Sequence, residues 1–89
     1  MTQGYHVSGR VQGVGFRWFT AARARSLRIV GWVRNTSDGG VELCASGNAD
    51  SLKTFEEYLH EGPPGARVEY VEKVMLSLRG FESSFEITY

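Results

Sequence analysis

The order of apolar and polar positions divides the chain into five strand-like stretches and two helix-like stretches. Alternation of apolar and polar residues, or a run of β-branched and aromatic residues, is typical of a β-strand. The predicted strands are residues 5–10, 30–35, 41–46, 68–75 and 85–89. Within residues 68–75 the apolar pattern slips around Tyr70 and Val71, which predicts a β-bulge in that strand.

The two remaining stretches have the spacing of amphipathic helices. The first, residues 16–27, contains neither glycine nor proline, and its apolar face consists of Phe16, Thr20, Ala24 and Leu27. The second follows Asn48, a good N-cap residue, and ends at the Gly-Pro-Pro-Gly run of residues 62–65. Its apolar positions are Leu52, Phe55 and Leu59.

The elements follow the order strand, helix, strand, strand, helix, strand, with a short strand at the end. Two helices on one face of a mainly antiparallel sheet give an α+β fold, the ferredoxin-like (split βαβ) sandwich. We expect residues 1–89 to form a single domain, because no linker, repeat or low-complexity tract interrupts the pattern. We also expect the first and second strands to lie side by side at the centre of the sheet.

Composition narrows the classes of function. The formal net charge is zero, whereas a general polyanion binder usually has a basic excess, so nucleic-acid binding is disfavoured. The only cysteine, Cys44, cannot form an internal disulfide, and no Cys or His spacing suits a metal. The chain has no signal peptide, long apolar segment or lipidation motif, so we expect a cytoplasmic protein that does not bind a membrane.

A glycine-rich loop, Gly9-Arg10-Val11-Gln12-Gly13-Val14-Gly15-Phe16-Arg17, joins the first strand to the first helix. Glycine lets successive backbone N–H groups turn toward one point, and the start of a helix adds unpaired donors. Such a concavity attracts a phosphate dianion, which the planar guanidinium of Arg17 can grip. From this loop alone, a tight turn followed by a solvated arginine remains an equal alternative.

Better-known phosphate motifs do not fit this loop. A Walker A loop needs Gly-Lys followed by Ser or Thr, and no such sequence occurs here. A dinucleotide-binding fingerprint needs a third glycine at position 18, which is Trp18. A tyrosine-phosphatase loop begins with a cysteine nucleophile, whereas Cys44 lies far away in a predicted strand, so a phosphoenzyme formed by that route is excluded.

Asn35, at the end of the second predicted strand, is the candidate partner of Arg17. A carboxamide can hold a water molecule at a fixed angle but cannot remove its proton, so the chemistry must work without a strong base. Acyl phosphate hydrolysis meets that condition, because a carboxylate leaves without protonation and phosphoryl transfer depends mainly on positioning and charge stabilisation. Thr36 is a supporting candidate whose hydroxyl could orient Asn35. Alternatively, Asn35 stabilises the turn that follows it.

Two blocks of the sequence resemble the signature pair of the acylphosphatase family. They are Val11-Gln12-Gly13-Val14-Gly15-Phe16-Arg17, and Gly31-Trp32-Val33-Arg34-Asn35 running into Asp38-Gly39. The resemblance implies that Arg17 and Asn35 are catalytic and that Val11 through Phe16, with Arg17, bind the phosphate. It also implies a monomeric cytosolic enzyme without metal or cofactor, which splits small acyl phosphates into a carboxylate and inorganic phosphate.

Two positions depart from the family pattern. Arg28 stands where the family commonly has glycine at the end of the first helix, and a left-handed residue there is strained by a Cβ atom by about 1 kcal/mol. Gly40 stands where many members carry a side chain. We expect neither position to touch the site.

Three other functions are less favoured. A non-catalytic module could bind a phosphorylated ligand with the same loop, but simple binding would not need Asn35. Similar domains occur in larger carbamoyl-transfer proteins of hydrogenase maturation, a possibility weakened by the initial Met1 and the lack of an attached domain. RNA binding on the sheet is disfavoured because the aromatic and basic octamer of RNA-recognition domains is missing.

Overall fold

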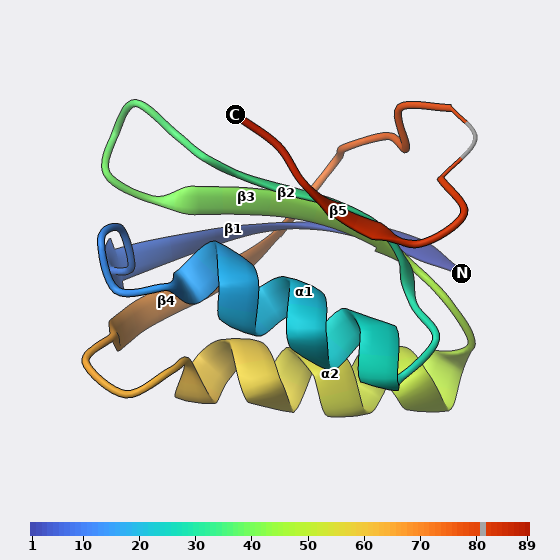
Figure 1. The fold of residues 1–89 in the computed structure, drawn as a ribbon, viewed down its shortest axis with the longest axis horizontal. Helices are drawn as coiled ribbons and strands as arrows, with labels where there is room; N and C mark the ends of the chain where they lie inside the picture. The colour runs from blue at the N-terminus through green and yellow to red at the C-terminus, as the bar shows by residue number, and fades with distance from the viewer. Residues whose placement is uncertain (81) are drawn as a thin grey trace.

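The computed structural model describes residues 1–80 and 82–89 as one sheet with two helices packed against it (Figure 1). In chain order the elements are β1 (Thr2–Arg10), α1 (Phe16–Ser26), β2 (Val30–Asn35), β3 (Val41–Ser46), α2 (Ala49–Glu61), β4 (Arg67–Val74) and β5 (Phe85–Ile87). All seven predicted elements are present. β1 begins three residues earlier than predicted, at Thr2, because its N-terminal part pairs with β3 from Thr2 onward.

The five strands lie in the order β4-β1-β3-β2-β5, so β3 separates β1 from β2. The prediction that the first two strands are neighbours is therefore wrong. A βαβ crossover can leave room for another strand between its two strands, and β3 fills that place by turning back from β2 as a hairpin. All pairings are antiparallel except that between β2 and β5, which is parallel.

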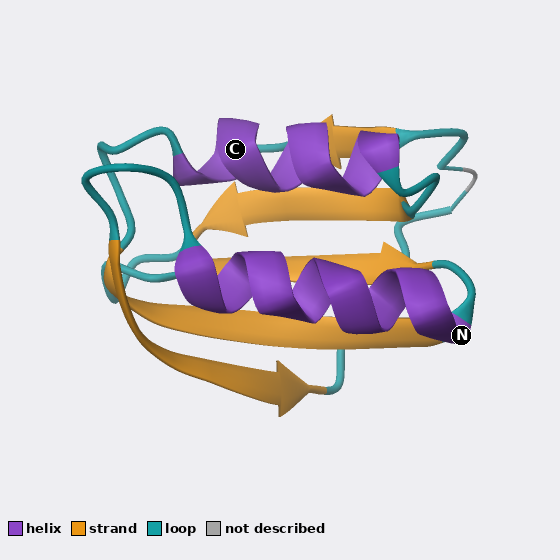
Figure 2. Ribbon diagram, turned by 90° about the horizontal axis from the view of Figure 1, so that it is seen from below, coloured by secondary structure: helices purple, strands orange, loops and turns teal. Residues whose placement is uncertain are grey.

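Both helices cover the same face of the sheet, as Figure 2 shows from the helix side. Between the two layers lies one core, to which strands, helices and loop 11–15 contribute. Its largest fully buried side chains are Tyr5, Phe16, Phe55, Phe85, Ile29, Leu43 and Leu59. The predicted α+β, ferredoxin-like sandwich is confirmed.

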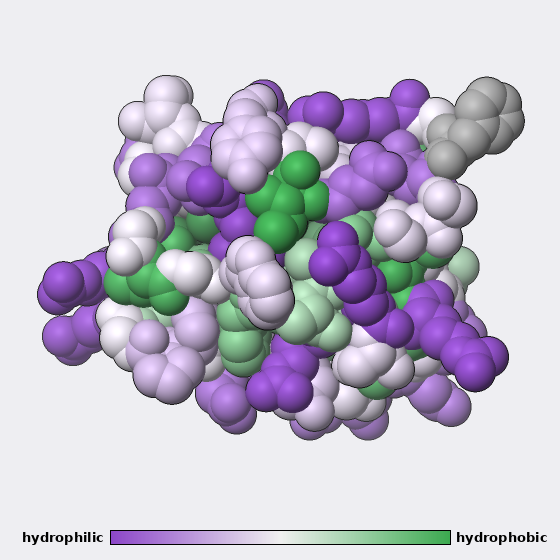
Figure 3. Space-filling model, in the orientation of Figure 1, coloured by the Kyte–Doolittle hydropathy of each residue, from purple (hydrophilic) through white to green (hydrophobic). Residues whose placement is uncertain are grey.

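The opposite face of the sheet carries Trp32, whose neighbour Val33 points into the core. The indole Nε1 of Trp32 donates to the carbonyl oxygen of Ser77 at 3.0 Å, and Arg79 lies 4.9 Å from the ring centroid. Trp32 is thus a packing residue on the sheet face. It is not part of an open stacking platform of the kind that binds RNA. On the face seen in Figure 3, apolar residues form separate patches among hydrophilic ones.

Two local irregularities follow from the sequence. Ser8 pairs with Tyr70 and Gly9 with Val68, so Glu69 has no partner on β1; the predicted bulge is confirmed, one residue before Tyr70. At the end of α1, Arg28 has a φ of 57°, and Ile29 N–H donates to the carbonyl of Ala24 at 2.9 Å. This is a Schellman C-cap with arginine at the left-handed position, as the family resemblance implies.

Candidate active site

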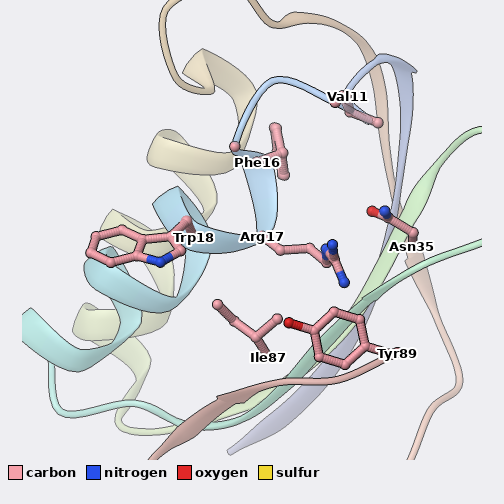
Figure 4. A pocket seen from close by; sticks show the side chains of 9 residues that line it. Val11, Phe16, Arg17, Trp18, Asn35, Ile87 and Tyr89 are labelled. Carbon is pink, nitrogen blue, oxygen red and sulfur yellow. The ribbon is translucent and has the colours of Figure 1, made fainter.

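A pocket of about 180 Å³ opens where the loop after β1 meets the end of β2 and the residues after β5 (Figure 4). It is lined by Val11, Gly13, Gly15, Phe16, Arg17, Trp18, Asn35, Ile87 and Tyr89. The two signature blocks thus meet in one cavity, although β3 lies between the strands that lead into them. They meet because the C-terminal ends of β1 and β2 lie at the same end of the sheet.

Two glycines of the loop, Gly13 and Gly15, line this pocket. Gly13 and Gly15 have φ values of 75° and 77°, in the left-handed region that favours glycine. A Cβ atom at either position would meet nothing within 4 Å, so the glycines serve the backbone conformation, and the space beside them is open. The loop can therefore present its N–H groups to a ligand without obstruction.

Helix α1 begins at this loop without a side-chain cap. Gly15 is its N-cap residue, and the first helical hydrogen bond runs from Phe19 N–H to the Gly15 carbonyl at 2.9 Å. The N–H groups of the first helical turn therefore have no partner within the helix, and that turn carries no acidic residue. A helix start with free N–H groups and its positive dipole end is suited to bind an anion.

Arg17 is half-buried, and its side chain is the only charged one among the described residues that line the pocket. Its Nη1 donates to the carbonyl oxygen of Thr88 at 3.2 Å, and its Cζ lies 4.7 Å from the centroid of the Tyr89 ring. The residues after β5 thus hold the guanidinium from one side. Its other N–H groups are available to an oxyanion, since a guanidinium has five.

Asn35 is the last residue of β2 and is half-buried. Its carboxamide points toward the pocket, on the side of the Arg17 guanidinium that is opposite Trp18 (Figure 4). Within residues 1–80 and 82–89 this carboxamide has no hydrogen-bond partner. Nothing in the described chain therefore supports the alternative that the Asn35 side chain stabilises the following turn.

Gln12 links the loop directly to the hairpin that begins at Asn35. Its Nε2 donates to the carbonyl oxygens of Thr36 at 2.7 Å and Gly40 at 2.8 Å. Gly40 also accepts from Thr36 N–H at 2.9 Å. The expectation that Gly40 does not touch the site is therefore wrong, because its carbonyl holds a residue of the predicted phosphate-binding loop.

The Thr36 hydroxyl lies in the adjoining turn, where it donates to Asp38 Oδ1. Gly40 N–H donates to the same oxygen at 3.0 Å, and Asp38 Oδ2 lies 3.1 Å from His6 Nε2. The Thr36 hydroxyl, then the Gly40 amide and to a smaller extent His6, hold the pKa of Asp38 below its usual value. The Thr36 side chain thus stabilises the turn, while its backbone carbonyl contacts Gln12.

The pocket contains six of the nine residues predicted for the site, namely Val11, Gly13, Gly15, Phe16, Arg17 and Asn35. The side chains of Val11 and Phe16 are buried in the core and anchor the loop from below. Gln12 faces the hairpin, Val14 packs against the edge of the core, and Thr36 faces Asp38.

Three pocket residues, Trp18, Ile87 and Tyr89, were not among those predicted. The sequence contains no local signal for Ile87 and Tyr89, because they reach the pocket only through the parallel pairing of β5 with β2. Trp18 directly follows Arg17 as the third residue of α1, and that position is the signal that could have identified it.

Two further kinds of feature are absent from the described part of the chain. Residues 1–80 and 82–89 contain no group of three or more His, Cys, Asp or Glu side chains that could hold a metal ion. Neither α1 nor α2 is long and apolar enough to cross a membrane.

Comparison with known proteins bears on the family of this chain. The acylphosphatase family model matches residues 3–87. An acylphosphatase from Salinibacter ruber is 59% identical over 66 residues, which make up 74% of this chain and 70% of that protein. The fold is similar to acylphosphatase from Bacillus subtilis, with a TM-score of 0.90, 40% identity and 100% coverage of both chains.

The fold is also similar to part of a much longer protein. T. kodakarensis HypF matches all of this chain with a TM-score of 0.85 and 34% identity, over 12% of its own length. The family model and the curated relative both point to one assignment. This chain belongs to the acylphosphatase family.

Proposed function

We propose that this protein hydrolyses acyl phosphates, with Arg17 and the loop amides binding the phosphoryl group and Asn35 positioning the attacking water. The observation that carries the proposal is the shared pocket of Arg17, Asn35 and the glycine loop. A carboxyl-phosphate anhydride fits this set of groups because its leaving group needs no acid. A phosphate ester, whose leaving group is a poorly stabilised alkoxide, should react far more slowly.

The first requirement is to bind a doubly charged phosphoryl group. Gly13 and Gly15 open the loop toward the ligand, and the start of α1 contributes free N–H groups. Arg17 adds a full positive charge in a fork that matches two phosphoryl oxygens. Because these donors are fixed before the substrate arrives, they stabilise the charge that spreads over the equatorial oxygens in the transition state.

The second requirement is in-line attack by water. Asn35 accepts a hydrogen bond from the water and directs its oxygen toward phosphorus from the side opposite the leaving carboxylate. The new P–O bond forms as the P–O bond to the acyl group breaks, and the bonding electron pair leaves with the carboxylate. The proton of the attacking water passes to a phosphoryl oxygen, so no protein base is needed.

We also propose that the protein acts as a cytoplasmic monomer of one domain, without metal or cofactor. A single core beneath a single sheet supports one domain. The binding of a phosphate without a metal is supported by the backbone donors and by Arg17, which supply the positive potential that a cation would otherwise provide. The alternative of a non-catalytic phosphate-binding module does not account for a carboxamide that points toward the pocket and has no hydrogen-bond partner among residues 1–80 and 82–89.

The test is hydrolysis of benzoyl phosphate in the presence of EDTA, measured as the loss of the anhydride. We expect strong acceleration over buffer, and no comparable turnover of phenyl phosphate. If benzoyl phosphate decays at its uncatalysed rate while inorganic phosphate still binds, the module is a binding protein and the enzymatic proposal fails. If activity appears only when a divalent cation is restored, the metal-free mechanism fails.

A further inference from the structure

We infer that Trp18 and Ile87 form a subsite for the organic part of the acyl group, which gives aryl and other bulky acyl phosphates an advantage over acetyl phosphate. The inference rests on the proposed function, because it assumes that a phosphoryl group is bound between the loop and Arg17. It goes further by assigning a substrate preference to residues that the reaction itself does not use.

The direction of attack determines where the acyl group must lie. In an in-line displacement, the incoming oxygen and the leaving oxygen stand on opposite sides of phosphorus. Asn35 and Trp18 lie on opposite sides of the Arg17 guanidinium, as Figure 4 shows. A water held by Asn35 therefore drives the leaving carboxylate toward Trp18, with Ile87 lying between Trp18 and the Tyr89 ring along that side.

The chemistry of that side differs from the rest of the pocket. The Asn35 side carries the carboxamide, whereas the side chains on the leaving-group side are Trp18 and Ile87. Trp18 is 73% exposed, although large apolar side chains are usually covered in a folded protein. An exposed indole beside an apolar isoleucine offers the kind of surface on which an aryl ring or a long alkyl chain is shielded from water.

Trp18 and Ile87 lie on the same two elements that position Arg17, the proposed ligand of the phosphoryl group. Trp18 follows Arg17 in the first turn of α1, and Ile87 is the last residue of β5, directly before the Thr88 carbonyl that holds Arg17. The distance between the subsite and the phosphoryl group is therefore set by the same two elements. A substrate with a bulky acyl group can occupy both places at once, whereas a very small acyl group cannot reach the subsite.

The subsite is tested by comparing two substrates in the protein and in Trp18→Ala. The substrates are benzoyl phosphate and acetyl phosphate, which carry the same reacting group and differ mainly in apolar area. Removing the indole should raise the KM for benzoyl phosphate roughly three- to tenfold more than the KM for acetyl phosphate, because only the larger acyl group has apolar area for the indole to cover. The kcat for benzoyl phosphate should hold, because the indole touches the acyl group equally in the ground state and in the transition state.

Two variants complete the design. Trp18→Phe restores an aromatic surface and should recover most of the preference for benzoyl phosphate. Tyr70→Ala is the matched control, because Tyr70 is 68% exposed, a similar fraction to Trp18, but lies on β4 and outside the pocket. The competitive inhibitors phenacylphosphonate and acetonylphosphonate, which cannot be hydrolysed, should show the same difference in Ki.

The outcomes separate this inference from the proposed function. Equal increases in KM for both substrates would mean that Trp18 acts through the phosphate loop, and unchanged ratios would mean that the indole meets no substrate; either result overturns the subsite. If the unaltered protein hydrolyses neither substrate, the proposed function itself fails. Hydrolysis of both substrates with an unchanged ratio in Trp18→Ala leaves the function intact and removes only the subsite.

Discussion

The side-chain Nε2 of Gln12 lies 2.7 Å from the backbone carbonyl oxygen of Thr36, and this hydrogen bond joins the two halves of the site. Gln12 belongs to the loop that faces the phosphate, and Thr36 follows directly after Asn35. The same nitrogen also donates to Gly40 across the hairpin. The distance between the loop and the Asn35 carboxamide is therefore fixed by one side chain in addition to the sheet.

Replacing this link should lower turnover more than phosphate binding. In Gln12→Met the side chain keeps its length but loses both hydrogen bonds, so Asn35 is free to shift relative to the bound phosphoryl group. We expect kcat to fall roughly ten- to hundredfold, since small errors in positioning are costly in phosphoryl transfer. The Ki of inorganic phosphate should change little.

Gln3→Met provides the matched control for this variant. Gln3 Nε2 also donates to two backbone carbonyls, those of Gly4 and Val74, but it lies toward the opposite end of β1 from the loop. Its replacement should affect stability without affecting kcat. Equal losses of activity in the two variants would show that Gln12 contributes only to general stability.

The variants Asn35→Ala and Arg17→Ala should lose different properties. Without the carboxamide the water is no longer directed, and we expect kcat to fall by about 10²–10³-fold while inorganic phosphate still binds. Without the guanidinium, both turnover and phosphate binding should be lost, because no other described residue that lines the pocket has a charged side chain. Calorimetric titration with phosphate, beside the benzoyl phosphate assay, distinguishes the two. Full activity in Asn35→Ala would rule out its role in positioning water.

Asp38 should make stability depend on pH in the acid range. Its folded pKa is lowered from the ordinary value of 3.8, mainly by the Thr36 hydroxyl and the Gly40 amide. The carboxylate therefore contributes stability at all pH values above the unfolded pKa, and this contribution is lost as the pH falls through the folded pKa. We expect Asp38→Asn to unfold at lower denaturant concentration than the unaltered protein at pH 6, with the gap closing toward pH 2. A gap of the same size at both pH values would contradict this.

Arg28→Gly should stabilise the protein. Arg28 is the only residue other than glycine with a positive φ in the described part of the chain, at 57°. Glycine removes the Cβ strain at this Schellman position, which is worth about 1 kcal/mol and raises Tm by about 4–8 °C in a domain of this size. Arg28→Ala is the control, because it removes the charge but keeps the Cβ atom. A similar rise of Tm in Arg28→Ala would assign the effect to charge.

The elements of the fold were predictable because their signals are local. The alternation in β3 and the helical spacing of Leu52, Phe55 and Leu59 each lie within a few residues. The left-handed C-cap at Arg28 was expected from the family pattern, in which glycine commonly occupies that position. The order of neighbouring strands was not predictable in this way, because alternation indicates which face of a strand is buried but not which strand lies beside it.

The residues of the candidate site likewise fall into those with a local signal in the sequence and those without one. Arg17 and the glycines were identifiable because they are adjacent in the sequence, and Asn35 because it ends a strand before a turn. The contributions of Ile87, Thr88 and Tyr89 depend on a parallel pairing over more than fifty residues, which leaves no mark in either segment. The second role of Gly40 was missed for a related reason, since a backbone carbonyl is the same in every residue type.

The position of β1 in the sheet has a consequence for how the protein behaves when β4 is displaced. β1 is paired on one edge with β3 and on the other with β4, so β4 alone covers an edge that would otherwise expose a row of unpaired amide groups. Local opening of residues 67–74 would remove that cover and expose the edge of β1. The opened molecule would then present unpaired amide groups with which a strand of a second copy can pair. We expect it to self-associate rather than only to lose activity.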